Sequence, residues 1–248
     1  MSAQCPPCPL LRVSSCHLHV DRRVRLTVRQ NCNMADDWRE ISVVRGPDGM
    51  RRCGWCVSAP ENVAYHDDEW GRPVTDDVRL YEKLCLEGFQ SGLSWLTILR
   101  KRERFREAFA GFDPERVARF GARDVERLMR DVGIVRHRGK IEAAIANARA
   151  TLEAQERSGS LGGLVWSFEP PRRGRPVPER LGDLAAVTSE SKALASALRR
   201  FGFRFVGPTT VYAAMESLGL VNDHLKSCHV RVPCNRLRQA TAVPELFQ

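Results

Sequence analysis

Helical spacing of apolar residues is the feature that most limits the fold of this 248-residue chain. From residue 74 onward, apolar side chains recur three or four positions apart, which is the period of a buried helix face. The first such stripe comprises Val78, Tyr81, Leu84 and Cys85. Gly88 and Gly92 are expected to interrupt it, and a second helix is expected through Trp95, Ile98 and Leu99.

Further helices are predicted beyond this pair. Asp113 followed by Pro114 is a typical helix start, because aspartate caps the first amides and proline suits the first turn. The next helix carries the apolar residues Val125, Leu128, Met129 and Val132. It is expected to stop at Gly133, which can adopt the left-handed conformation of a helix end, and the helical period resumes at Ile141.

The second half of the chain is also predicted to be helical. Residues 159–183 are rich in glycine, proline and arginine and are expected to form a long loop. Two helices are predicted after it, at about 189–201 and 208–218, and short apolar runs such as Phe203 to Val206 are the only strand candidates. The predicted fold class is therefore mainly α.

The ends of the chain differ from its middle. Residues 1–49 show no sustained helical or strand period and are interpreted as a loosely ordered extension; residues 50–230 form the main domain, and 231–248 a C-terminal tail. Another metal site is conceivable in the extension, but little apolar sequence surrounds it to build a framework. Its candidate ligands are Cys5, Cys8, Cys16 and His17.

Composition narrows the class of protein. The net charge of +9 favours a polyanionic partner such as nucleic acid, with simple solubility as the alternative. No stretch approaches the about 18 apolar residues of a membrane span, and the first 20 residues do not resemble a secretory signal. A cytoplasmic location is therefore expected, where the nine cysteines stay mostly reduced and metal binding becomes more plausible than disulfide formation.

The sequence Cys53-Gly54-Trp55-Cys56 is compatible with a redox pair or with part of a metal site. A redox pair is typically found at the start of a helix that follows a strand. Arg51 and Arg52 show no strand pattern, and Pro60 prevents a helix from starting directly after the pair. The redox interpretation is therefore disfavoured.

A metal site needs partner ligands, and the chain offers His66, His224 and Cys228 in addition to Cys53. His224 and Cys228 are four residues apart and would share one face of a helix. The alternative is that these are ordinary core or surface residues that never meet, because 158 residues separate His66 from His224. Two thiolates and two imidazoles would close a structural site, and Cys56 remains a spare candidate.

Several segments, in order along the chain, resemble the bacterial 3-methyladenine DNA glycosylase I family. The resemblance covers about residues 50–228. Its segments are Arg52-Cys53-Gly54-Trp55, Ala64-Tyr65-His66-Asp67-Asp68-Glu69-Trp70-Gly71, Leu86-Glu87-Gly88 with Gly92-Leu93-Ser94-Trp95, Gly133-Ile134 with Arg136-His137-Arg138-Gly139-Lys140-Ile141, Val165-Trp166-Ser167-Phe168, and Gly219-Leu220-Val221-Asn222-Asp223-His224.

The resemblance implies a helix-hairpin-helix fold and an enzyme that hydrolyses the N-glycosidic bond of 3-methyladenine in double-stranded alkylated DNA. It implies one structural Zn²⁺ held by Cys53, His66, His224 and Cys228. It also implies a base pocket formed by Glu87, which is the candidate catalytic residue, with Trp55, Tyr65, Trp70 and Trp95. One departure is Asn62, which stands where members of the family often carry an aromatic residue. A monomer without strand-cleaving activity is expected.

The pocket residues suit a cationic base. Methylation at N3 places a positive charge on adenine, and Tyr65 or Trp95 can stack on the flipped base. Glu87, if ionised, favours the cation over neutral adenine. Taken alone, Glu87 would more commonly be a solvated helix residue, and the aromatic residues could simply pack in the core, where Trp166 is also expected.

The segment Gly133 to Lys140 joins two predicted helices. Glycines such as Gly133 and Gly139 allow backbone amides to approach a phosphate, and the following helix presents its positive end. Arg136, Arg138 and Lys140 add charge, so these five residues are predicted to contact the DNA backbone. The alternative is an exposed basic turn.

Two functions compete with a glycosylase. One is a zinc-stabilised DNA-binding module without catalysis, which would not need the pocket residues Glu87, Tyr65 and Trp95. The other is a thiol redox protein that uses Cys53 and Cys56.

Overall fold

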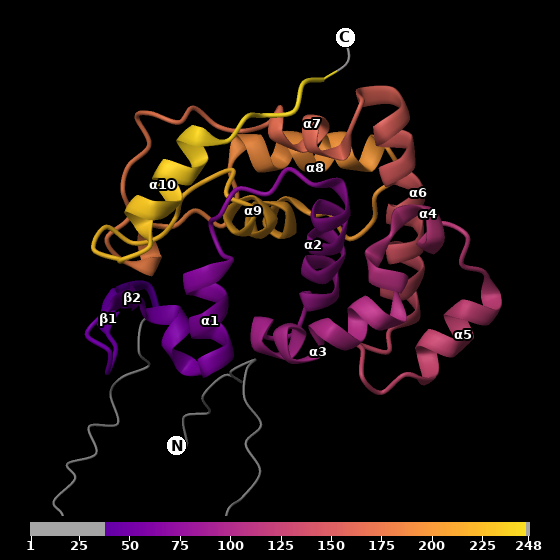
Figure 1. Ribbon diagram of the computed structural model, residues 1–248, viewed down its shortest axis with the longest axis horizontal. Helices are drawn as coiled ribbons and strands as arrows, with labels where there is room; N and C mark the ends of the chain where they lie inside the picture. Colours follow the sequence, from indigo (N-terminus) through magenta and orange to yellow (C-terminus); the bar gives the residue numbers. More distant parts are fainter. Residues whose placement is uncertain (1–37, 247–248) are drawn as a thin grey trace, which may run out of the picture. The chain divides into compact units, whose positions relative to one another are not determined.

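The computed structural model describes residues 38–246, which belong to one structural unit spanning residues 36–248. The described part is mainly helical, as predicted, with ten α-helices and one short two-stranded antiparallel sheet (Figure 1). The helices are α1 (Pro60–Asp68), α2 (Asp77–Gln90), α3 (Trp95–Ala108), α4 (Pro114–Val117), α5 (Ala122–Arg130), α6 (Arg138–Ser158), α7 (Leu161–Trp166), α8 (Ser189–Arg200), α9 (Pro208–Ser217) and α10 (Arg231–Ala240). The strands are β1 (Val43–Arg45) and β2 (Arg51–Cys53), and the 3₁₀ helices are η1 (Trp38–Glu40), η2 (Gly54–Ser58), η3 (Ala110–Phe112) and η4 (Leu181–Asp183).

Local capping explains where several helices begin. Asp113 accepts hydrogen bonds from the amides of Glu115 and Arg116, and Pro114 occupies the first turn of α4, as predicted. The side chains of Ser94 and Thr188 cap α3 and α8 in the same way. These helix starts follow from sequence because the cap and its amides are neighbours in the chain.

The core forms where α2 packs against α6 and α9. The predicted stripe of α2 is largely buried, and the Tyr81 hydroxyl donates to the carbonyl of Ala144 in α6 at 2.8 Å. Gly88 does not interrupt α2, contrary to expectation. A Cβ there would lie 3.2 Å from Cβ of Phe205, so this glycine permits a close approach inside the helix.

The helix before the basic segment Gly133 to Lys140 (the basic hairpin) ends earlier than predicted. It stops at Arg130, its capping residue Asp131 is extended, and Val132 is 72% exposed. The φ angle of Gly133 is not positive, so this residue does not form the predicted left-handed helix end. Asp131 instead accepts a hydrogen bond from the Gly133 amide at 2.9 Å, which turns the chain toward α6.

Three further expectations need correction. Residues 203–206 form no strand, and Phe205 has a φ of 56°. The expected loop at 159–183 contains α7, which buries Trp166 in the core as predicted. The strands lie at 43–45 and 51–53, where pairing with a partner strand outweighs the weak local pattern.

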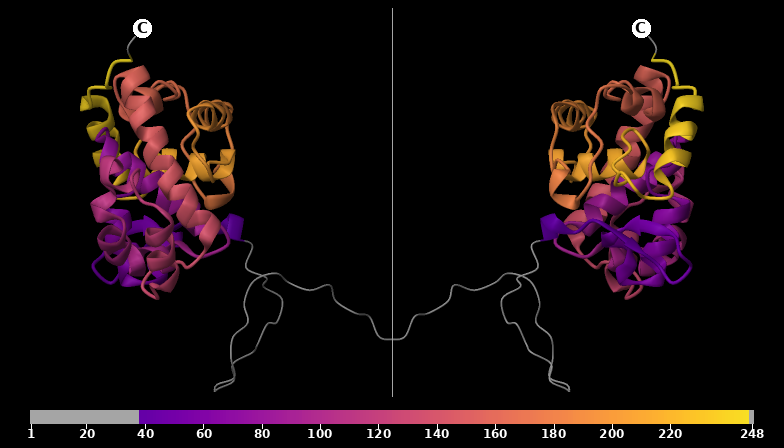
Figure 2. Two further views of the ribbon diagram at one scale, coloured as in Figure 1. Left: turned by 90° about the vertical axis from the view of Figure 1, so that its right-hand side faces the viewer. Right: turned by 90° about the vertical axis from the view of Figure 1, so that its left-hand side faces the viewer.

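The ends of the domain are more structured than predicted. Residues 38–49 contain η1 and β1, and Val43 pairs with Cys53 across the sheet; the rest of the expected extension, including its cysteines, lies outside the described residues. The first part of the expected tail forms α10, drawn in yellow in Figure 2, and its Cys234 packs against Leu225 and Val230 of the segment before it. Arg238 anchors it, because its buried guanidinium donates to Glu169 at 2.9 Å.

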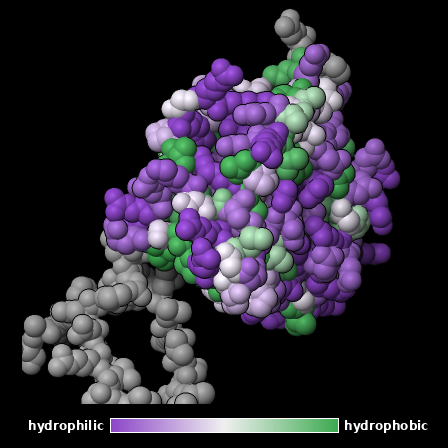
Figure 3. Space-filling view, turned by 60° about the vertical axis from the view of Figure 1, so that its left-hand side comes forward, coloured by the Kyte–Doolittle hydropathy of each residue, from purple (hydrophilic) through white to green (hydrophobic). Residues whose placement is uncertain are grey.

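The surface is largely hydrophilic on the face shown in Figure 3, with small separate apolar patches. Across residues 38–246, no helix is both long enough and apolar enough to cross a membrane.

Gly219 provides a test of the turn that leads from α9 to His224. Its φ is 77°, and a Cβ would lie 2.6 Å from the backbone nitrogen of Pro73. Replacing Gly219 by alanine should lower the free energy of unfolding by about 2–4 kcal/mol, because left-handed strain and a backbone clash add together. Gly111→Ala is the control, since Gly111 has a φ of 72° but open space around it. Equal losses in denaturant unfolding would show that the close contact with Pro73 is unimportant.

Candidate functional site

Four buried side chains from distant parts of the chain meet at one point. Cys53 ends β2, His66 lies in α1, and His224 and Cys228 follow α9. Their candidate ligand atoms all lie within 4.8 Å of one another. The structure therefore brings together all four residues predicted as metal ligands. His224 and Cys228 are not on a helix, contrary to expectation; the segment between them turns, with the Cys228 amide donating to the carbonyl of Leu225.

The surroundings of the two histidines fit a metal ion. Nε2 of His66 and Nδ1 of His224 face the thiols, at 3.4 and 3.7 Å from Sγ of Cys228. The opposite ring nitrogens contact oxygen atoms: Nδ1 of His66 lies 2.7 Å from Asp67, and Nε2 of His224 lies 3.0 Å from the Trp70 carbonyl. Metal-bound histidines typically have such outer partners, which orient the ring and fix its tautomer.

Electrostatics at the cluster favour a thiolate. A hydrogen bond from Cys53 lowers the pKa of the Cys228 thiol, and hydrogen bonds from His224 and His66 lower it further. Asp67, which orients His66, is itself held by Nε of Arg52 at 2.9 and 3.1 Å. Two thiols and two imidazoles form a donor set that suits a closed, structural metal site.

Cys56 is buried but does not belong to this group of four. Two expectations that disfavoured a redox pair are wrong. Cys53 ends a strand, a 3₁₀ helix follows it, and α1 begins at Pro60, because proline is tolerated in the first turn of a helix. Both thiols are fully buried, however, whereas redox-active cysteines are partly exposed.

A cavity of about 340 Å³ lies next to the cluster. All five residues predicted to bind a base line it: Trp55, Tyr65, Trp70, Glu87 and Trp95. The aromatic rings form a continuous wall, with centroids 5.2 Å apart for Trp55 and Trp70 and 5.1 Å apart for Tyr65 and Trp95. The remaining lining residues are Gln90, Leu181, Leu184, Ala185, Ala186, Ala213 and Glu216.

Glu87 is the charged residue at the centre of this arrangement. Its side chain is 5% exposed, so it is not a solvated helix residue. Burial, followed by the charges of Glu87 and Glu69, raises the pKa of the Tyr65 hydroxyl well above its usual range, so Tyr65 stays protonated. The cavity thus combines aromatic faces, a neutral hydroxyl and a carboxylate, which is a suitable set for binding a flat cation.

Sequence reasoning missed two charged residues at the cavity. Lys83 forms an ion pair with Glu87 at 2.8 Å, and the four-residue spacing on α2 was the available signal. Glu216 from α9 lines the cavity, and burial, followed by the charges of Asp223 and Glu87, raises the pKa of its carboxyl group well above the usual range. Its position depends on packing between α2 and α9, which no local pattern reveals.

The indole nitrogen of Trp95 and the side-chain amide of Asn62 have hydrogen-bonding surroundings that the sequence did not predict. The indole nitrogen of Trp95 is buried and has no hydrogen-bond partner within the described part of the chain. Unsatisfied donors of this kind are uncommon in cores and are often functional. Asn62 is absent from the cavity lining, and its amide instead donates to the Ser58 hydroxyl at 2.9 Å.

The basic hairpin between α5 and α6 presents only part of the predicted charge. Arg136 is exposed, and Arg138 is half-exposed and paired with Glu126 and Glu142. Lys140 is buried, contrary to expectation, and its ammonium donates to the carbonyls of Phe89 and Ser91 at 2.9 and 2.6 Å. Lys140 therefore ties the hairpin to the carboxyl end of α2, where free carbonyls attract a cation.

The two glycines of the hairpin lie near its turn and at the start of α6. Gly139 is the second residue of α6, where helix amides point outward, and its neighbour His137 caps the helix by accepting from the Lys140 amide at 3.2 Å. Gly133 donates its amide to Asp131, so this group is already satisfied within the hairpin.

Known proteins with similar sequences and structures form one consistent set. Residues 55–232 match the protein family described as methyladenine glycosylase. The chain is 49% identical over 179 residues to DNA-3-methyladenine glycosylase 1 of Escherichia coli (strain K12), covering 72% of this chain and 96% of that protein. It is 45% identical over 186 residues to DNA-3-methyladenine glycosylase of Haemophilus influenzae, covering 74% and 97%. A solved structure of 3-methyladenine DNA glycosylase I from Staphylococcus aureus, described as showing the basis of 3-methyladenine recognition, matches with a TM-score of 0.68 and 38% identity over 73% of this chain and 96% of that chain.

Replacing Cys53, which belongs to the cysteine and histidine cluster, should have a different effect from replacing Cys56, which does not. Cys53→Ser should reduce the metal bound per protein chain and lower the unfolding temperature by about 10 °C, because several kcal/mol of metal binding supports the folded state. Cys56→Ser should keep the metal, since Cys56 lies outside the group of four. Metal content by elemental analysis and thermal unfolding measure both. Equal metal loss in the two variants would mean that Cys56 is a ligand.

Proposed function

Because the chain belongs to the methyladenine glycosylase family, we propose that it hydrolyses the N-glycosidic bond of 3-methyladenine in alkylated DNA and leaves an abasic site. The observation that carries this proposal is the buried Glu87 carboxylate in an aromatic cavity. The relatives named above are all described as 3-methyladenine glycosylases, and the chain covers nearly their whole length.

The cavity suits selection of the damaged base. A base inside a duplex must leave the stack before an enzyme can act on it, and the aromatic wall replaces the lost stacking by about 1–3 kcal/mol per base. Cationic 3-methyladenine gains more than neutral adenine from both the aromatic faces and Glu87. A DNA-binding module without catalysis would have no need for a buried carboxylate in such a cavity.

Hydrolysis of this N-glycosidic bond requires little from the protein beyond binding of the damaged base. The cationic base is already a good leaving group, so hydrolysis does not depend on its protonation. Interactions that strengthen as the bond breaks are sufficient to lower the barrier. We therefore assign Glu87 to recognition first and to catalysis indirectly, with Tyr65 and Trp95 as stacking partners and Trp55 and Trp70 as the outer wall.

The enzyme is proposed to be monofunctional. Strand cleavage requires an amine that attacks the sugar, and Lys83 is the lysine nearest to Glu87 among the described residues. Its ammonium is held by Glu87 and by the Tyr65 hydroxyl, and Lys83 does not line the large cavity. An ammonium that is paired with a carboxylate and lies outside the base cavity is poorly placed to attack the sugar.

We assign Zn²⁺ to the cluster of Cys53, His66, His224 and Cys228 on the basis of its donor set and the oxygen partners of both histidines. The ion would be structural. It would join β2 and α1 to the segment after α9, and it would take no part in the hydrolysis.

We assign the helix-hairpin-helix role to α5, the turn at 131–137 and α6, with double-stranded DNA as the partner. Arg136 and Arg138 and the first amides of α6, including that of Gly139, would contact phosphates. Lys140 would support the hairpin from inside. We place the glycosylase domain at residues 38–240, wider at both ends than the 50–230 expected from sequence.

Glu87→Gln tests the proposed pocket. Excision of 3-methyladenine from methylated DNA should fall by about 10- to 100-fold, because a charge-assisted hydrogen bond of about 1.5–3 kcal/mol is lost. Selectivity against normal adenine should fall as well. Released bases can be identified by chromatography under single-turnover conditions. Glu153→Gln on the exposed side of α6 is the control; full activity and selectivity of Glu87→Gln would contradict the assignment.

Arg136→Ala tests the hairpin. Affinity for undamaged duplex DNA should fall a few-fold, and the slope of log affinity against log salt should decrease by about one, because one phosphate contact is lost. Arg157→Ala removes the same charge at the other end of α6 and should leave the slope unchanged. Equal slopes for the two variants would exclude a phosphate contact by Arg136.

A further inference from the structure

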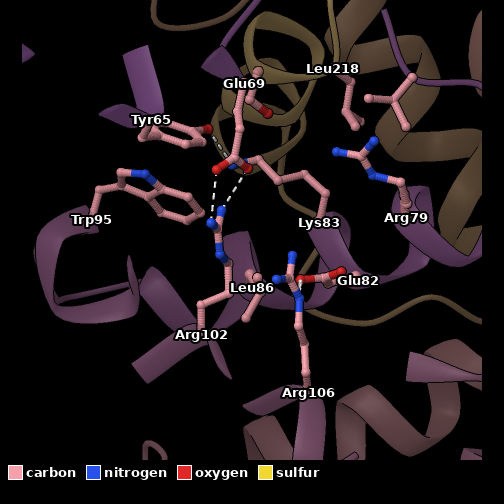
Figure 4. A pocket seen from close by; sticks show the side chains of 12 residues that line it. Tyr65, Glu69, Arg79, Glu82, Lys83, Leu86, Trp95, Arg102, Arg106 and Leu218 are labelled. Carbon is pink, nitrogen blue, oxygen red and sulfur yellow. Dashed lines mark hydrogen bonds and ion pairs between the residues drawn. The ribbon is translucent and has the colours of Figure 1, made fainter. Parts of the chain in front are cut away.

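Lys83 contacts three residues of the base cavity at once. Its ammonium lies 2.8 Å from Oε1 of Glu87, donates to the Tyr65 hydroxyl at 2.7 Å and lies 3.6 Å from the centroid of the Trp95 ring. The side chain is 12% exposed. Figure 4 shows it running from α2 toward Tyr65 and Trp95.

Lys83 approaches these residues from outside the base cavity. It lines a separate cavity of about 50 Å³, whose wall also includes Tyr65 and Trp95. These two rings therefore belong to both cavities, with Lys83 on one side and the space for the base on the other. A base can enter the larger cavity without displacing the ammonium.

The surroundings of Glu87 make this cation important. An ionised carboxylate in an apolar site is costly unless it is paired. The other charged groups that line the two cavities are the acids Glu216, Glu69 and Glu82 and the cations Arg79, Arg102 and Arg106. Arg102 is engaged by Glu69 at 2.6 and 2.8 Å. Arg106 is engaged by Glu82 at 2.8 Å, and Arg79 is exposed. Within residues 38–246, Lys83 is the cation that forms an ion pair with Glu87.

Burial lowers the pKa of Lys83, and the charge of Glu87 opposes this effect. The two groups therefore support each other's charged forms. The ion pair uses Oε1 of Glu87, which leaves Oε2 to accept a hydrogen bond from a base.

We propose that Lys83 is a positioning residue that holds Glu87 ionised and oriented before the base arrives. This inference rests on the proposed function and deepens it. Without Lys83, a buried carboxylate surrounded by Glu216 and aromatic rings would take up a proton more readily and would lose its preference for a cationic base. Lys83 thus supplies the counter-charge of Glu87 before a base is bound.

The pH dependence of base excision tests this role. Lys83→Met removes the charge but keeps an unbranched side chain against Trp95. Its single-turnover excision of 3-methyladenine from methylated DNA should fall about tenfold on the acid limb of the pH profile and recover at higher pH. The acid limb of the profile should move upward by about one pH unit or more, because loss of a close counter-charge typically shifts a buried carboxylate by that amount.

Matched variants separate positioning from general effects. Lys83→Arg keeps the charge and should keep the wild-type acid limb. Arg79→Met removes the same charge one turn earlier on α2, where the side chain lines the same small cavity but is exposed and is not paired with Glu87, and it should also leave the limb in place. Lys83→Gln is a second uncharged variant, with circular dichroism used to check folding, and the same upward shift is expected. In a Glu87→Gln background, Lys83→Met should produce no further shift.

An unshifted acid limb in either folded uncharged variant would overturn the proposal, as would an equal shift in Arg79→Met. The wild-type arm of the assay reports the proposed function separately. Absence of base release by the wild-type protein would reject the proposed function and this inference with it. Release by the wild type with no shift in the Lys83 variants would reject the role of Lys83 alone.

Discussion

A carboxylate buried beside aromatic rings is the constraint on which this structure depends. Glu87 is 5% exposed, and a lysine of the same helix lies 2.8 Å away, a pairing that offsets part of the cost of burying a charge. The aromatic rings give this carboxylate a partly apolar surrounding, in which charge interactions are stronger than in bulk water. Such a surrounding favours a flat cation over a neutral base.

The cysteine and histidine cluster and the base cavity are built on shared elements. Tyr65 and His66 are consecutive residues of α1, and one lines the cavity while the other joins the cluster. Trp70 also links them, because its ring lines the cavity and its carbonyl contacts His224 at 3.0 Å. A metal ion at the cluster would therefore fix the aromatic wall, although it would lie outside the reaction.

Sequence reasoning located most of both sites, but for different reasons. The five cavity residues and the four cluster residues were found through ordered motifs that resemble a known family, because spacing alone cannot join His66 to His224. The prediction of a DNA contact, which had been suggested by the basic neighbours Arg136 and Arg138, was wrong for Lys140. Its ammonium instead satisfies the carbonyls at the end of α2, a segment about 50 positions away.

The sequence by itself determined the helical class, the capped helix starts such as Asp113-Pro114, and the buried stripe of α2, because these depend on residues within a few positions of one another. Only the tertiary structure decided which charged groups are buried and with which partners. Glu216, Lys140 and Arg238 acquire their roles from packing between remote elements. Desolvation and pairing depend on that three-dimensional environment, and the same side chains on an exposed helix face would simply be solvated.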